Sequence, residues 1–169
     1  MSVITRVYVV HDFDFLPNFN PKILMTACGH VAGAAYFYQP PVSFIRPYEA
    51  KSMGVSLHAK YGGHFAYRAV VIFPEVHLPN DFEEEKAKKV LNTTMEEAEV
   101  VELFNKDWQD GRYRDCGGPV ERYSPTQLQY FSESPPKRWS LIAHWFTEDV
   151  VMWVKHIIYF VKKVCDVFI

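Results

Sequence analysis

The sequence lacks the short motifs that mark the commonest enzyme classes. It has no GxGxxG loop for dinucleotides, no phosphate-binding P-loop, no HExxH zinc motif and no GxSxG nucleophile motif. No CxxC pair is present either, because the three cysteines, Cys28, Cys116 and Cys165, are scattered, which argues against a zinc ribbon or a thioredoxin-type site. An odd number of thiols is typical of a protein from a reducing compartment.

The chain also lacks an excess of positive charge and a secretory leader. Its net charge is −2 and its pI is about 6.4, unlike the strongly basic proteins that bind nucleic acids. The first fifteen residues have neither the charged start nor the long apolar run of a signal peptide. Internal repeats and low-complexity tracts are not found. We therefore expect a cytoplasmic protein, with no nucleic-acid partner.

What the sequence does contain suits one globular domain with a large core. It has 169 residues, of which 49% are apolar and 22% are charged, values that exclude wholesale disorder. Aromatic residues make up 16%. Such a share can fill a core, and it can also line a pocket for a broad, flat ligand.

Local patterns predict a strand over 3–10 and a helix over 22–39. Asn20 and Pro21 suit a helix cap and the first helical position, and Pro40–Pro41 cannot continue a helix. This predicted helix contains two glycines, each costing about 1 kcal/mol relative to alanine. We expect that they allow the close approach of another backbone or of a flat ligand.

Later in the chain the patterns predict two strands and two helices. The strands cover 53–58 and 65–73, separated by a turn at 61–63, and we expect them to pair as a hairpin with 70–73 buried on both faces. A capping-box pattern at 93–97 opens a helix that runs to about 108, and Ser124–Pro125 opens another to about 131. The charged segment 78–92 suits either a helix or a loop.

The segment 150–169 is strongly apolar but is interrupted by charged residues on one helical face. A membrane span needs about 20 nearly uncharged residues. The pattern predicts an amphipathic helix that packs on a partner, on the domain core or on a membrane surface.

Four side chains stand out as candidates for chemistry. His30 is isolated, and an isolated histidine is more often a hydrogen-bonded core residue than a ligand; Cys28, two positions away, does not share its helical face. Arg68 precedes an apolar run, and the same signal, a charge in an unusual setting, marks Arg114 and Arg138. Arg68 suits either an ion pair, with Asp12, Asp115 or Glu121, or bidentate binding of a ligand carboxylate or phosphate.

Four ordered blocks of sequence resemble the CblC family of intracellular cobalamin (vitamin B12) trafficking proteins. The blocks run from Pro21 to Gln39, from Gly54 to Arg68, from Phe104 to Asp115 and from Glu121 to Pro136, so the resemblance covers roughly residues 10–142. It implies an α+β fold, an incomplete relative of the nitroreductase and flavin-reductase fold with an antiparallel sheet and packed helices. It also implies that the family's N-terminal segment is missing before Val3, which suits a truncated form with a cobalamin-binding domain over 1–142 and a divergent tail over 143–169.

The resemblance implies an enzyme, a cyanocobalamin reductase and alkylcobalamin dealkylase. Such proteins bind cobalamin with its lower base detached and remove the upper ligand, cyanide by reduction with a flavin (FMN or FAD) and alkyl groups by transfer to glutathione. The cobalt is carried by cobalamin, and we expect no other metal and no certain catalytic side chain. The implied partners are a CblD-like protein and methionine synthase, with homodimerisation as a further option. The alternative is a catalytically incompetent fragment that binds or regulates.

The resemblance also implies two sets of binding residues. The glutathione-binding arginines of the family map onto Arg68, Arg114 and Arg138. The cobalamin contacts map onto Asp12, Ile23, Leu24, Met25, Thr26, Phe37, Tyr38, Gln39, Ser56 and Tyr67.

Overall fold

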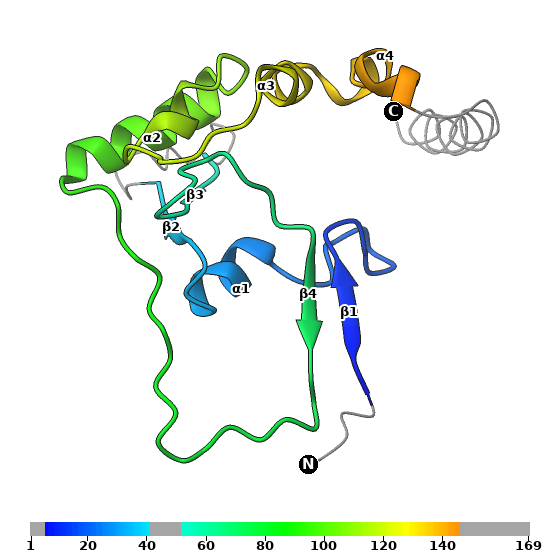
Figure 1. Ribbon diagram of the computed structural model, residues 1–169, viewed down its shortest axis with the longest axis vertical. Helices are drawn as coiled ribbons and strands as arrows, with labels where there is room; N and C mark the ends of the chain where they lie inside the picture. Colours follow the sequence, from blue (N-terminus) through cyan, green and yellow to red (C-terminus); the bar gives the residue numbers. More distant parts are fainter. Residues whose placement is uncertain (1–5, 41–51, 146–169) are drawn as a thin grey trace. The chain divides into compact units, whose positions relative to one another are not determined.

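The computed structural model describes residues 6–40 and 52–145 (Figure 1). Contacts divide the chain into two units, which meet in the sequence between Ser124 and Pro125. The first unit contains all the described strands, and the second contains the short helices that follow. Within the described ranges, no helix is long and apolar enough to cross a bilayer.

The strands of the first unit form two antiparallel pairs. Strand β1 (Tyr8–His11) pairs with β4 (Ala69–Ile72), and β2 (Tyr36–Tyr38) pairs with β3 (Val55–Leu57). The predicted hairpin between the second and third of the expected strands is therefore wrong, because each of these strands pairs instead with a segment from earlier in the chain. The turn that follows β3 is present, and it closes on itself through a bridge between His58 and Gly62.

Helix α1 (Met25–Val31) contacts strands of both pairs (Figure 1). It is much shorter than the predicted helix over 22–39, and that prediction is wrong at both ends. Its N-cap is Leu24 rather than Asn20. It ends just before Gly33, whose φ of 73° is left-handed, and the β-prone aromatic residues that follow enter β2.

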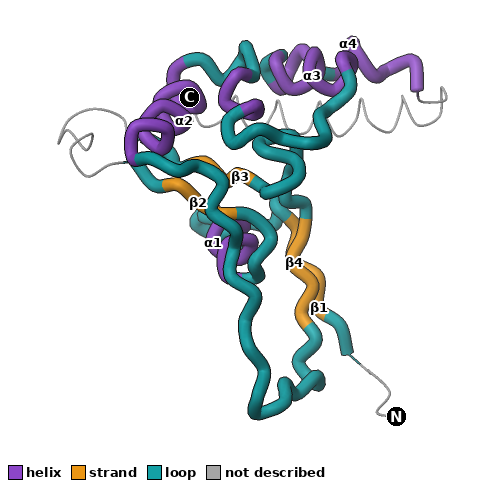
Figure 2. The backbone as a smooth tube through the Cα atoms, turned by 60° about the vertical axis from the view of Figure 1, so that its left-hand side comes forward, coloured by secondary structure: helices purple, strands orange, loops and turns teal. Residues whose placement is uncertain are grey.

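Helix α2 (Thr94–Lys106) confirms the capping box that the sequence predicts. The Thr93 hydroxyl accepts a hydrogen bond from the Glu96 backbone N–H at 3.2 Å, and the Glu96 carboxylate accepts one from the Thr93 N–H at 2.9 Å. Before this helix, residues 73–93 form a long loop without helix or strand, drawn as a continuous teal segment between β4 and α2 in Figure 2. The loop alternative for 78–92 is thus the correct one.

The hydrophobic core lies where α2 meets the β2–β3 pair and the 3-10 helix η2 (Arg112–Asp115). At its centre the Tyr38 side chain is almost fully buried, and its hydroxyl accepts hydrogen bonds from the backbone N–H groups of Val90 and Leu91 at 2.9 and 3.0 Å. The long loop is thereby tied to β2. The buried core residues are Tyr38, Val55, Leu57, Leu91, Val100, Val101 and Tyr113.

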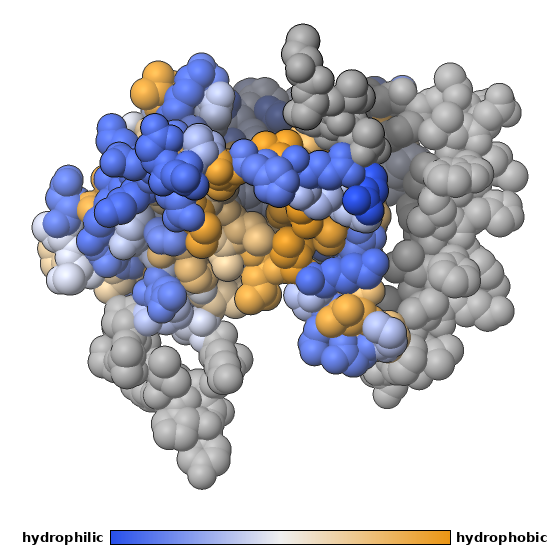
Figure 3. Space-filling model, turned by 90° about the horizontal axis from the view of Figure 1, so that it is seen from below, coloured by the Kyte–Doolittle hydropathy of each residue, from blue (hydrophilic) through white to orange (hydrophobic). Residues whose placement is uncertain are grey.

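The β1–β4 pair, by contrast, exposes apolar side chains. Val9, Val71 and Phe73 keep 47%, 48% and 45% of their surface exposed, so the expectation that 70–73 is buried on both faces is wrong. In the space-filling view, apolar residues lie together in the middle of the face drawn, with hydrophilic residues around them (Figure 3). A two-stranded sheet buries little of its own side-chain surface, and this pair leaves much of it in solvent.

The second unit comprises α3 (Pro125–Ser132), η3 (Pro135–Lys137), α4 (Trp139–Ile142) and η4 (Ala143–Trp145). Helix α3 begins at Pro125 as the sequence predicts, and Pro135 opens the next short turn rather than continuing it. The predicted amphipathic helix over 150–169 lies outside the described residues.

Candidate functional site

An open hollow of about 150 Å³ lies between α1, β3 and η2 in the first unit. Five separate segments contribute to it: Thr26 comes from α1, Ser56 from β3, Tyr67 from the stretch before β4, Phe104 from α2 and Arg114 from η2. The aromatic rings of Phe65, Phe104 and Tyr113 and the backbone around Gly54 and Gly63 complete its wall. The hollow is thus mainly apolar, with hydroxyl groups and one guanidinium on its lining.

The Arg114 guanidinium is held in place by the turn that carries Gly63. Its Nη1 donates to the Gly63 carbonyl oxygen at 2.5 Å, and the Gly63 N–H donates in return to the Arg114 carbonyl oxygen at 2.9 Å. The guanidinium also lies against the rings of Tyr113 and Tyr123, at 4.7 and 5.4 Å from the ring centres. Arg114 is only 8% exposed, so its position is fixed by packing as well as by hydrogen bonds.

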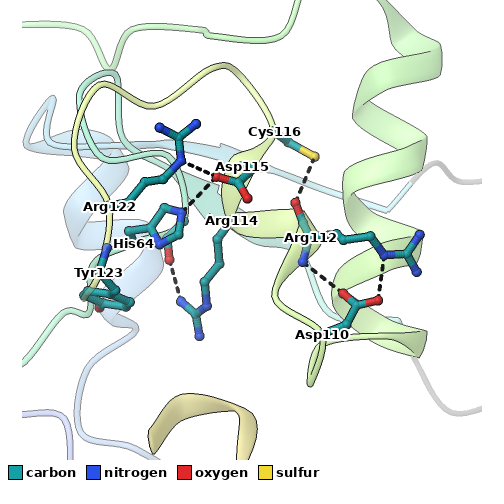
Figure 4. Close-up of polar contacts among 9 residues, drawn as sticks. His64, Asp110, Arg112, Arg114, Asp115, Cys116, Arg122 and Tyr123 are labelled. Atoms are coloured by element: carbon teal, nitrogen blue, oxygen red, sulfur yellow. Dashed lines mark hydrogen bonds and ion pairs between the residues drawn. The ribbon is translucent and has the colours of Figure 1, made fainter. Parts of the chain in front are cut away.

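A buried histidine reinforces the same junction, as Figure 4 shows. The His64 Nε2 lies 3.3 Å from the Asp115 Oδ1, and its Nδ1 accepts a hydrogen bond from the Tyr123 N–H at 3.4 Å. These two contacts assign the proton of the neutral ring to Nε2. The Arg122 Nε donates to the same Asp115 oxygen at 2.6 Å. The sequence reasoning missed this cluster, since nothing local in the sequence links His64 to Asp115.

Burial and hydrogen bonding shift the pKa values in this cluster. Burial lowers the pKa of His64, and the Asp115 carboxylate only partly offsets this effect. Burial alone would raise the pKa of Asp115, but hydrogen bonds from Arg122 and His64 outweigh it and leave the pKa below its usual value. The pair is therefore a neutral imidazole against an ionised carboxylate near pH 7.

Arg68 forms the ion pair that was one of its two interpretations. Its Nη1 lies 2.7 Å from the Asp12 Oδ2, so Asp12 is the partner among the three predicted carboxylates. The Arg68 side chain is 71% exposed, while that of Asp12 is 27% exposed. A guanidinium this exposed remains accessible to a ligand anion even while it is paired.

The glycines of the small-residue segment approach protein atoms closely. A Cβ built on Gly29 would lie 2.2 Å from the Tyr67 hydroxyl oxygen, and one on Gly33 would lie 2.4 Å from the Glu85 carbonyl oxygen. The first contact is with a flat ring and the second with a backbone. The predicted reason for these glycines, close approach, is confirmed, and in this structure the approaching groups belong to the chain itself.

Two hydroxyl groups beside the hollow, those of Ser56 and Tyr67, are buried next to each other without a hydrogen bond of good geometry. Neither the Ser56 Oγ nor the Tyr67 hydroxyl makes a hydrogen bond of good geometry with the described residues. Burial raises the pKa of Tyr67, and the nearby Ser56 hydroxyl moderates that rise. Unsatisfied buried polar groups of this kind are uncommon in native proteins and call for a physical explanation.

The remaining predicted site residues are dispersed. Leu24 is the N-cap of α1 and is 65% exposed, with Ile23 and Met25 half-buried beside it. Phe37 lies opposite Ser56 in the β2–β3 register, whereas the Tyr38 side chain is in the core. Gln39 follows β2 and is exposed.

Arg138 and His30 have local partners. In the second unit the Arg138 Nε donates to the Glu133 carbonyl oxygen at 2.9 Å, and its guanidinium lies over the rings of Tyr130 and Phe131. In the first unit the His30 Nδ1 accepts a hydrogen bond from the Phe37 N–H at 3.1 Å. His30 therefore has the hydrogen-bonded role that the sequence favoured. Within the described ranges, no three His, Cys, Asp or Glu side chains are grouped to hold a metal ion.

Comparison with known proteins identifies one family. The model of the methylmalonic aciduria and homocystinuria type C family matches residues 2–142. A "MMACHC-like protein" of Caenorhabditis elegans is 40% identical over 148 residues, covering 81% of this chain and 54% of that protein. The cyanocobalamin reductase / alkylcobalamin dealkylase of Gallus gallus is 45% identical over 140 residues, covering 82% and 58%. The chain spans just over half the length of these relatives.

A solved structure agrees with these sequence relatives. The crystal structure of a B12-trafficking protein CblC from C. elegans superposes with a TM-score of 0.72 at 39% identity. The match covers 85% of this chain and 57% of that one. Mixed helices and antiparallel strands, as the sequence predicted, are thus shared with a solved protein.

Proposed function

Because the chain belongs to the methylmalonic aciduria and homocystinuria type C family, we propose that it processes cobalamin. In this proposal it binds cobalamin with the lower base detached and removes the upper axial ligand, by glutathione-dependent dealkylation or flavin-dependent reductive decyanation. One structural observation supports it most. Thr26, Ser56 and Tyr67, which map onto cobalamin contacts, line the same hollow as Arg114, which maps onto a glutathione-binding arginine.

The proposed dealkylation needs positioning and charge rather than a proton-transferring side chain. The glutathione thiolate forms a carbon–sulfur bond with the upper alkyl group, and the electron pair of the breaking cobalt–carbon bond stays on cobalt, giving cob(I)alamin and a thioether. Arg114, and Arg68 with its exposed guanidinium, would bind glutathione carboxylates and orient the sulfur. Nearby positive charge also favours the thiolate over the thiol. Arg138, in the second unit, is the third mapped arginine.

The reductive branch needs an electron source from outside the chain. A flavin would supply electrons to the cobalt of cyanocobalamin, and cyanide would then leave. We assign no residue of the described ranges to the flavin. The other mapped cobalamin contacts, Asp12, Ile23, Leu24, Met25, Phe37, Tyr38 and Gln39, belong to this proposal as well.

A titration of methylcobalamin, followed by visible absorbance, tests the proposal. The full chain should shift the spectrum to the base-off form. Addition of glutathione should then yield a methyl thioether, detected by mass spectrometry. No spectral shift at high protein concentration would refute cobalamin binding, and a shift without thioether would refute the transferase step alone.

A second function, that of a binding or regulatory fragment, has an observation in its favour. The β1–β4 pair leaves apolar side chains in solvent. Such a surface suits a polypeptide partner, of which a CblD-like protein, methionine synthase or a second copy are the proposed examples. Retention of a CblD-like partner on the immobilised chain, with no turnover of methylcobalamin, would select this function over the enzyme.

A further inference from the structure

We propose that the Tyr67 side chain is a displaceable plug, which is seated against Gly29 in the present structure and must swing out before a large, flat ligand enters the hollow. The inference rests on the proposed function for the identity of that ligand, cobalamin. The seat itself is a property of this chain and is testable without any ligand.

The first argument is the fit between ring and helix. Gly29 is buried in α1, and a Cβ there would lie 2.2 to 2.3 Å from the Cζ, hydroxyl and Cε1 atoms of Tyr67. No side chain larger than hydrogen is compatible with the seated ring. The phenol ring of Tyr67 therefore occupies the space that a Cβ at position 29 would take.

The second argument is size. Pockets for drug-sized ligands usually measure about 300–1,000 Å³. The hollow measures about 150 Å³, and cobalamin is larger than any drug-sized ligand. The hollow is open, so much of such a ligand can lie outside it, but a macrocycle that lies flat against α1 needs the space that Tyr67 occupies beside Gly29.

The third argument is that Tyr67 is less firmly held than Tyr113, another tyrosine of the wall. Tyr113 belongs to the buried core and packs edge-to-face on Phe104 at 5.0 Å. Tyr67 lies in the stretch 64–68, which the structure leaves outside helix and strand, and is only half-buried. Its ring packs edge-to-face on Phe65 at 5.0 Å.

The fourth argument is that the seated ring carries an energetic penalty. The Tyr67 hydroxyl is buried beside the Ser56 hydroxyl, and this contact among the described residues is not a hydrogen bond of good geometry. Water would satisfy the Tyr67 hydroxyl once the ring swings out, so the penalty favours the open position. Packing against Gly29 and Phe65 favours the closed position. The balance of these two terms sets the fraction of molecules that can bind.

Three substitutions change that balance in known directions. Tyr67→Phe removes the unsatisfied hydroxyl and should stabilise the seated ring. Tyr67→Ala removes the plug. Gly29→Ala puts a methyl group where the ring sits and should expel it. Because apparent affinity scales with the fraction of open molecules, we expect Gly29→Ala to bind methylcobalamin about tenfold more tightly and Tyr67→Phe about fivefold more weakly. Tyr67→Ala also loses a mapped cobalamin contact, so we expect it to bind more tightly than wild type by less than Gly29→Ala does.

The double variant gives the sharpest test. Gly29→Ala acts through Tyr67, so the combination of Gly29→Ala with Tyr67→Ala should bind no more tightly than either single variant. Tyr8→Phe, at a 53% exposed position on β1, is the matched control and should bind as the wild type does. Tighter binding by Tyr67→Phe, weaker binding by Tyr67→Ala, or multiplicative effects in the double variant would overturn the plug.

Tyrosine nitration by tetranitromethane provides the ligand-free readout on the full chain. Mass spectrometry should show Tyr67 nitrated slowly in the wild type and rapidly in Gly29→Ala, with exposed Tyr8 as the internal standard. Equal Tyr67 rates in the two proteins would overturn the plug. If the wild type gives no methylcobalamin shift, the proposed function fails, and nitration still decides about the plug. If Gly29→Ala does not fold, the opposite binding effects of Tyr67→Phe and Tyr67→Ala decide it.

Discussion

Asp12 and Arg68 are joined twice, once through their side chains and once through their backbones. The carboxylate Oδ2 lies 2.7 Å from the guanidinium Nη1, and the Asp12 N–H donates to the Arg68 carbonyl oxygen at 3.0 Å. The backbone contact continues the antiparallel pairing of β1 with β4 beyond His11 and Ala69. One residue mapped to cobalamin and one mapped to glutathione are thereby held side by side.

The first prediction concerns Arg68→Ala. An ion pair with so exposed a guanidinium stabilises the fold by about 0–1 kcal/mol, so the free energy of unfolding should change little. A charge-assisted contact with a glutathione carboxylate is worth about 1.5–3 kcal/mol, so the KM for glutathione in dealkylation should rise about tenfold or more. Methylcobalamin binding, followed by visible absorbance, should be retained.

Arg6→Ala is the matched control for Arg68→Ala. The Arg6 side chain is 67% exposed, and its Nε lies 2.8 Å from the Glu75 Oε1. Its replacement by alanine therefore removes a surface ion pair similar to that of Arg68, from the same unit. It should leave the KM for glutathione unchanged. An equal loss of cobalamin and glutathione binding in Arg68→Ala would instead mean that the residue is structural.

The second prediction concerns the core hydroxyl of Tyr38. Phenylalanine at this position would leave the buried N–H groups of Val90 and Leu91 without their acceptor. We expect Tyr38→Phe to lower the free energy of unfolding by about 1–3 kcal/mol, measured by urea denaturation. Tyr8→Phe, on the exposed face of β1, should lie within about 0.5 kcal/mol of wild type. A stability loss as large in Tyr8→Phe would contradict this account.

The third prediction concerns the cap of α2. Thr93→Ala removes the hydroxyl that accepts from the Glu96 N–H, and it should lower the free energy of unfolding by about 1 kcal/mol. Thr94→Ala, one residue later in the first turn, makes the same change of side chain at a position that is not the N-cap, so it is the matched control. The two melting curves should separate, and coincident curves would show that the capping box adds no stability.

The fourth prediction concerns pH and His64. Burial holds its pKa in the folded protein below the ordinary value of 6.5, so the unfolded chain takes up the proton first as the pH falls. The stability that comes from burying a neutral His64 is fully present above pH 6.5. It is lost progressively as the pH falls through 6.5 towards the lower pKa of the folded state. His64→Gln should flatten this part of the curve of melting temperature against pH.

His77→Gln serves as the control for the pH experiment, because His77 is exposed in the long loop. Its curve should follow that of the wild type. Asp115, whose pKa is lowered in the folded state, should add a second loss only below its ordinary value of 3.8. A His64→Gln curve with the wild-type slope between pH 5 and 6.5 would show that His64 does not carry the effect.

Local signals in the sequence were sufficient for helices α2 and α3. The residues that start α2, Thr93 and Glu96, are three positions apart, so cap and helix are both determined by a short stretch of chain. The same holds for Pro125 at the start of α3. In residues 22–39 the local pattern favours one long helix, but the aromatic residues at 36–38 pair with β3 instead. The helix is therefore limited to Met25–Val31.

Strand pairing and the candidate site could be predicted only in part. The hairpin prediction used sequence proximity, whereas β1–β4 and β2–β3 are long-range pairs selected by the packing of α1 and α2. The resemblance placed Thr26, Ser56 and Tyr67 in one set, and the structure brings them to one hollow. The His64–Asp115 contact joins residues 51 apart, and no pattern of a single sequence reports such a pair.

The reciprocal bonds between Gly63 and Arg114 have a consequence for the order of folding. They join positions 51 residues apart, so a long loop must close before the guanidinium is fixed. Loop closure of this length is entropically costly and slows the step that needs it. On the ribosome, the turn at Gly63 has no counterpart until η2 has emerged, and the Arg114 end of the hollow is therefore assembled after the strands around it have been synthesised.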